Sequence, residues 1–102
     1  MKKELEELLC QRYPELFAER TLSPEVSCMG RGMECGDGWF DLIDTLCSTI
    51  QFAIDHGNAP PVRVVQVKEK MGTLRFYIRG GDEQVRGMIA MAVAVSALIP
   101  EG

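Results

Sequence analysis

The sequence predicts an α+β fold, an antiparallel β-hairpin packed against a central amphipathic helix and flanking N- and C-terminal helices. Two observations carry this prediction. Apolar residues recur with helical spacing over residues 38–56, and two alternating segments flank the dipeptide Met71-Gly72. The 102 residues can build a modest core, so we expect residues 1–102 to form a single domain.

A first helix is expected over residues 2–12. Leu5, Leu8 and Leu9 fall on one helical face, while glutamates turn outward. Pro14 ends this helix near Tyr13, because the residue before a proline avoids the α-helical conformation. Residues 21–38 are rich in glycine and show little periodicity, so a long irregular segment is expected there.

The central helix is expected over residues 38–56. Asp37 fits the N-cap position, Asp41 adds a favourable negative charge near the N-terminus, and Gly57-Asn58 supplies a stop. The apolar residues follow the spacing of a stripe that faces a core. They are Trp39, Leu42, Ile43, Leu46, Ile50, Ala53 and Ile54.

The hairpin is expected over residues 63–79, followed by a last helix over residues 83–98. Apolar and polar residues alternate in both strands, and Gly72 tolerates the positive φ of a tight turn. Gly80-Gly81-Asp82 ends the second strand and caps the last helix. The expected core consists of Trp39, Leu42, Ile43, Leu46, Ile50, Val65, Val67, Leu74, Phe76 and Ile78.

Three aspartates of the central helix form the first candidate site. Asp37, Asp41 and Asp44 recur at spacings of four and three residues, which places them on one helical face. They are either a solvated face or a negative surface that docks on a basic partner, with help from Arg31 in the glycine-rich segment. No histidine or lysine lies near them in sequence, so acid–base catalysis is not expected.

The polar side of the hairpin forms the second candidate. Lys68, Lys70, Arg75 and Arg79 surround Tyr77, and cations around an aromatic ring suit single-stranded nucleic acid. The alternative is a solvated strand face that discourages edge-to-edge aggregation. The net charge of −4 disfavours nucleic acid as the partner and favours a basic protein surface.

Cysteine and histidine do not form a recognisable metal or catalytic pattern. Cys28, Cys35 and His56 lack the closely spaced ligand pairs of zinc sites, so no metal or cofactor is expected. The alternative is a metal site formed by these three residues. Cys35 and His56 should lie at opposite ends of the central helix, too far apart for a nucleophile and its base. We therefore expect a protein that is not an enzyme.

The last helix is apolar on every side between residues 88 and 95. Such a helix needs to be buried on every side, and a domain of this size has few residues available to bury a terminal helix completely. We therefore expect Met88, Met91 and Val95 to lie in a homodimer or partner interface. The first ten residues do not resemble a secretory signal, and the longest apolar run is too short to span a membrane. A cytoplasmic protein with reduced cysteines is expected.

Two motifs, CGDGWF at residues 35–40 and VKEKMGTLRFY at residues 67–77, resemble a family of small bacteriophage and prophage proteins. The resemblance covers roughly residues 13–90 and brings no activity or catalytic residue. Many members end in a zinc-ribbon-like tail with Cys-x-x-Cys, whereas this sequence has Pro100-Glu101-Gly102 there, so zinc is not carried over.

The resemblance implies an accessory protein in the cytoplasm of a bacterial host, where it binds host machinery stoichiometrically. The function that it most favours is inhibition of bacterial antiviral defence, as anti-CRISPR proteins do. The alternative is a nucleic-acid-binding accessory protein that uses the basic side of the hairpin.

Overall fold

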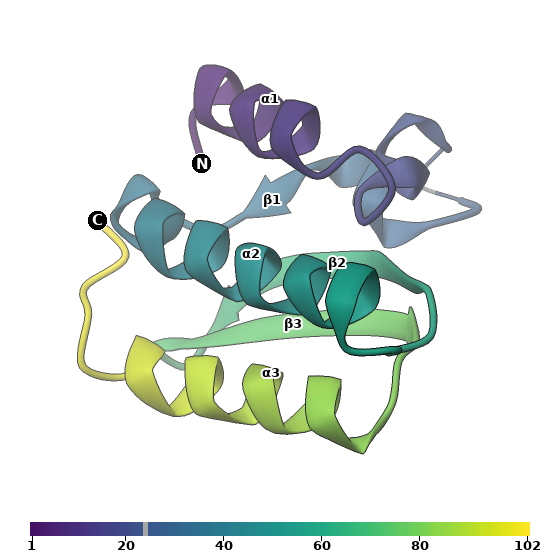
Figure 1. Ribbon diagram of the computed structural model, residues 1–102. Coiled ribbons are helices and arrows are strands. Elements are labelled where there is room, and N and C mark those ends of the chain that lie inside the picture. The colour runs from purple at the N-terminus through teal and green to yellow at the C-terminus, as the bar shows by residue number, and fades with distance from the viewer. Residues whose placement is uncertain (24) are drawn as a thin grey trace.

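Three α-helices and a three-stranded mixed sheet make up the described part of the computed structural model, residues 1–23 and 25–102 (Figure 1). The fold is α+β, as predicted. The helices are α1 (Lys3–Arg12), α2 (Phe40–His56) and α3 (Glu83–Ser96), and the strands are β1 (Met33–Glu34), β2 (Val62–Lys70) and β3 (Thr73–Gly80). Short 3-10 turns occur at η1 (Ala18–Thr21), η2 (Cys28–Arg31) and η3 (Asp37–Trp39). In these ranges no helix is long and apolar enough to cross a membrane.

The predicted hairpin is present, with β2 and β3 antiparallel and Lys70 opposite Thr73 at its closed end. Met71 and Gly72 form the turn with φ values of 54° and 80°. Positive φ at both central positions matches the right-handed twist of the strands, so this turn geometry suits a hairpin.

The prediction that Val65 belongs to the core is wrong. The register shifts between Val64 and Gln66, so Val65 is the extra residue of a β-bulge and is half-buried. The bulge resets the alternation of the strand, and Val62, Val64 and Val67 are the fully buried residues of β2.

Two other predicted core residues lie at the margin of the core. Leu42 and Ile78 are half-buried and pack against it, while the remaining predicted core residues apart from Val65 are buried. The short strand β1 was not predicted. It pairs in parallel with β2, with Met33 opposite Val67, and two residues are too few to show alternation in a sequence.

Helices α2 and α3 run antiparallel to each other and cover one face of the hairpin (Figure 1). Ile43, Leu46 and Ile50 of α2 are buried, as is Val85 of α3. Asp82 caps α3 as predicted, since its carboxylate accepts a hydrogen bond from the Val85 amide at 3.0 Å.

The predicted N-cap role of Asp37 is wrong. Residues 37–39 form the 3-10 turn η3, so the α-helix begins only at Phe40, and its start has no side-chain cap. The Asp37 carboxylate instead accepts a hydrogen bond from the Lys2 amide at 2.7 Å. A contact with the N-terminal segment has replaced the expected local one.

The segment from Cys35 to Trp39 is where the two ends of the chain meet (Figure 1). The Gly36 amide donates to Glu101 Oε1 at 2.6 Å, and Trp39 Nε1 donates to the Ile99 carbonyl at 2.7 Å. The ammonium group of Met1 donates to the carbonyl of Cys35. Residues 35–39 therefore bind both terminal segments of the chain.

Candidate protein-binding face

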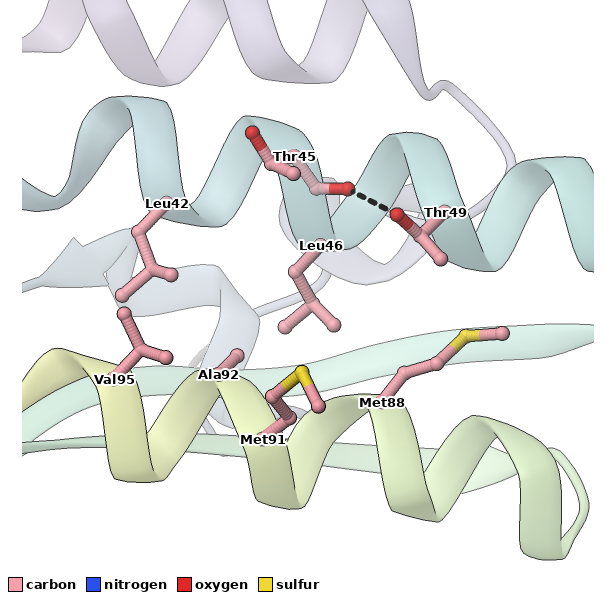
Figure 2. A pocket seen from close by; sticks show the side chains of 8 residues that line it. All are labelled: Leu42, Thr45, Leu46, Thr49, Met88, Met91, Ala92 and Val95. Atoms are coloured by element: carbon pink, nitrogen blue, oxygen red, sulfur yellow. Dashed lines mark hydrogen bonds between the residues drawn. The ribbon is translucent and has the colours of Figure 1, made fainter.

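A groove of about 310 Å³ lies between α2 and α3. Each helix contributes four of the lining residues, and Figure 2 shows their side chains. Leu42 of α2 lies opposite Val95 of α3, and Leu46 points toward Ala92 and Met91, as the antiparallel arrangement requires. The lining consists of Leu42, Thr45, Leu46, Thr49, Met88, Met91, Ala92 and Val95.

None of the eight lining residues is charged. The polar atoms come from two threonines, and the Thr49 hydroxyl already donates to the Thr45 carbonyl at 2.8 Å (Figure 2). The groove therefore offers a partner mainly apolar contact, and burial of such surface is what drives association.

The outer side of α3 extends this apolar surface. Met91 is 71% exposed, and Leu98, just beyond the helix, is 82% exposed. The chain has no charged residue between Gly87 and Ile99. The exposed residues of this stretch are Gly87, Ala90, Met91, Ala94, Ala97 and Leu98. Small side chains allow close approach of another helix, so we call the groove and these six residues the α2–α3 face.

Met88, Met91 and Val95, the residues predicted for an interface, all line the groove. Met88 and Val95 are half-buried, while Met91 stands open to solvent. Leu98 was not among the predicted residues, although its position within the uncharged stretch of the sequence is a signal that could have identified it.

The three aspartates do not form one open acidic stripe. Asp37 pairs with Lys2, whose Nζ lies 3.8 Å from its carboxylate. Asp44 faces α1, where it pairs with Arg12 at 2.9 Å and accepts a hydrogen bond from the Tyr13 hydroxyl at 2.7 Å. Asp41 is exposed, and within residues 1–23 and 25–102 it forms no ion pair shorter than 4.0 Å.

Arg31 is exposed at the end of η2. That turn packs against η1 and β2. The structure thus leaves Asp41 as the open acid of the predicted set, with Asp37 and Asp44 engaged by cations of the N-terminal segment.

The basic side of the hairpin is assembled as the alternation predicted. Lys68 lies opposite Arg75 and Lys70 opposite Thr73, while Tyr77 is 45% exposed. Arg79 forms two hydrogen bonds with Glu19, at 2.9 and 3.2 Å, and they lower the pKa of that carboxyl group. Arg63 also lies on this side, opposite Arg79. It was not among the predicted residues, because the hairpin was expected to begin only at residue 63.

Three of the four cysteines are parts of the core. Cys10, Cys35 and Cys47 are buried, and burial raises the pKa of the Cys35 thiol to about 11 and that of the other two thiols as well. Such thiols are protonated at neutral pH and are poor nucleophiles. His56 lies at the far end of α2, with its ring 4.8 Å from that of Phe52.

Metal ligands do not gather in the part of the chain that the structure describes. No group of three or more histidine, cysteine, aspartate or glutamate residues is placed there to hold an ion. Comparisons with family models, curated proteins and solved structures give no match to this chain.

Proposed function

We propose that the protein acts by stoichiometric binding to another protein, which docks on the α2–α3 face. The observation that carries the proposal is the groove of about 310 Å³ beside an uncharged helix side on which Met91 is 71% exposed. An exposed apolar surface beside a polar rim is typical of a protein interaction site. Methionine adapts its shape to a partner, which suits Met88 and Met91 to this role.

The occupant that fits this face best is an amphipathic helix of the partner with basic flanks. A groove between two helices accepts apolar side chains that recur at helical spacing. Asp41 and Asp55 are exposed on α2, one of the two helices that line the groove, and offer negative charge to such flanks. A net charge of −4 attracts such a helix over longer distances.

We further propose that the partner belongs to a bacterial host and that binding inhibits antiviral defence. The resemblance of the two sequence motifs to bacteriophage and prophage proteins supports this part of the proposal. The protonated, buried thiols and the scattered carboxylates support a binding protein over an enzyme.

A pair of matched variants tests the docking face. The protein is immobilised and exposed to lysate of a bacterial host. The binding of any captured host protein to the Met91→Glu and Met71→Glu variants is then measured. Both changes place a carboxylate at an exposed methionine, but Met71 lies at the hairpin turn, 88% exposed and outside the groove lining. We expect Met91→Glu to abolish capture and Met71→Glu to leave it unchanged. Equal capture by both variants would reject the face.

A plaque assay tests the biological role. Bacteria that carry an active CRISPR system against a phage are transformed with the wild-type gene or with the Met91→Glu variant. We expect the wild-type gene to restore plaque formation and the variant to fail. If neither restores plaques although the wild-type protein accumulates, inhibition of this defence is excluded.

Light scattering separates a host partner from a second copy of this chain. If the wild-type protein alone is a dimer and Met91→Glu is a monomer, then Met88, Met91 and Val95 form a homodimer interface and the proposal of a host partner on this face fails. A wild-type monomer leaves the face open for the partner.

A further inference from the structure

The hairpin concentrates positive charge in an acidic protein. Residues 62–80 carry five of the 11 cations and one of the 15 acids, a net charge of +4. The remaining residues carry six cations and 14 acids, a net charge of −8. The acidic Glu69 is turned toward its own turn, where its carboxylate accepts a hydrogen bond from the Gly72 amide at 2.7 Å. The negative net charge of the chain therefore hides a basic surface.

The strand register places like charges directly opposite each other. Lys68 is paired with Arg75, and Arg63 is paired with Arg79. Like charges in cross-strand pairs destabilise a sheet, so solubility alone does not account for this choice of residues. Glu19 neutralises one end of this surface through Arg79. The pair Lys68 and Arg75 forms no ion pair within 4.0 Å in the described ranges.

An aromatic ring lies between the two cationic pairs. Tyr77 is 45% exposed and is paired with Gln66, between the Arg63–Arg79 and Lys68–Arg75 pairs along the strands. From Arg63 to Lys70 the strand extends about 23 Å, at about 3.3 Å for each residue step. This length is sufficient for several nucleotides of a single strand.

We propose that this outer face of the hairpin binds single-stranded nucleic acid, with Lys68, Lys70 and Arg75 on phosphates and Tyr77 stacked on a base. Cations that follow a backbone, together with a ring on which a base stacks, are the two components of sequence-tolerant single-strand binding. This site is separate from the α2–α3 face, so the proposal of nucleic-acid binding does not depend on the proposed protein partner.

The test is a titration of a fluorescent 15-nucleotide oligo(dT), followed by anisotropy at several salt concentrations. We expect the logarithm of the binding constant to fall with the logarithm of salt, with a slope of about −2 for three phosphate contacts on a single strand. Lys68→Glu/Arg75→Glu should weaken binding at least tenfold and flatten the slope. Lys3→Glu/Arg86→Glu changes the net charge equally at exposed positions of α1 and α3 and should leave binding within about twofold.

Tyr77→Leu and inorganic polyphosphate distinguish nucleic acid from anions in general. Loss of stacking should weaken oligo(dT) binding about tenfold, while polyphosphate of matched charge should compete poorly. The proposal is overturned by undetectable binding at 50 mM salt or by equal loss in the two double variants. It is also overturned if polyphosphate competes as well as oligo(dT) and Tyr77→Leu binds normally. Met91→Glu should retain oligo(dT) binding whatever the outcome for the protein partner.

Discussion

Gly36 and Gly38 lie so close to the C-terminal residues that neither can carry a side chain. A Cβ atom on either glycine would collide with the main chain of Pro100 or Glu101. Asp37, between the two glycines, accepts a hydrogen bond from the Lys2 amide, and the indole of Trp39, which follows them, donates one to the Ile99 carbonyl. At the scale of single residues, the fold accounts for the identity of residues 36–39, so we look for functional residues on other parts of the surface.

Two glycine variants test this explanation. We expect Gly38→Ala to displace the C-terminal residues and to lower the free energy of unfolding by about 1–3 kcal/mol through lost hydrogen bonds. Gly87→Ala is the control, because a Cβ there meets nothing within 4 Å and an alanine in a helix gains about 0.5–1 kcal/mol. Urea unfolding followed by the fluorescence of Trp39, the single tryptophan, measures both. A Gly38→Ala variant as stable as the wild type would contradict the close approach.

Tyr13 predicts a dependence of stability on pH. Burial and the hydrogen bond to Asp44 raise the pKa of Tyr13 to about 12, above its usual value of 10. The folded protein holds this proton more tightly than the unfolded chain does. The contribution of Tyr13 to the free energy of unfolding is therefore complete below pH 10 and is lost as the pH rises toward 12. Tyr13→Phe should therefore lose less stability between pH 8 and pH 11 than the wild type does. Urea unfolding curves for both proteins at the two pH values measure these losses of unfolding free energy, and identical losses would refute the prediction.

At the scale of elements, the bulge in β2 has a measurable consequence. Val64→Ala removes two fully buried methyl groups and should cost roughly 2 kcal/mol of unfolding free energy. Val65→Ala, at the half-buried bulge, should cost less than about 1 kcal/mol. The uninterrupted alternation that the sequence indicates would give the opposite order. Denaturant unfolding of the two variants decides between the registers.

The bulge also shows which elements a sequence can predict. Met71-Gly72 and Asp82 act within three residues of themselves, so their roles as turn and cap were predictable and are confirmed. The bulge at Val65 and the strand β1 depend on partners far along the chain, which periodicity does not report. The contact between Asp37 and Lys2 likewise joins residues 35 positions apart.

The candidate sites divide in the same way. The polar side of the hairpin and the apolar set on the last helix follow from strand and helix periodicity, and the structure places each set on one surface. The aspartate stripe failed as an open surface because the cations that engage it, Lys2 and Arg12, come from the N-terminal segment. Helical spacing contains no information about those partners.

At the scale of the whole molecule, the surface is divided between two kinds of chemistry. The hairpin carries a net charge of +4, while the α3 side of the α2–α3 face has no charged residue between Gly87 and Ile99, and α2 carries the exposed acids Asp41 and Asp55. A protein partner and a nucleic acid would therefore occupy different surfaces and could bind together. We expect neither ligand to displace the other, which a titration of oligo(dT) into the protein complex measures. Mutual exclusion would contradict this division.

Methionine methyl groups report directly on the central claim, that a partner protein docks on the α2–α3 face. The six methionines include Met88 and Met91 in the groove and Met71 at the hairpin turn, while Met29 and Met33 are buried. With ¹³C-labelled methionine methyl groups, addition of the captured host protein should shift the Met88 and Met91 resonances and leave that of Met71 in place. Shifts at Met71 with Met88 and Met91 unchanged would contradict the claim.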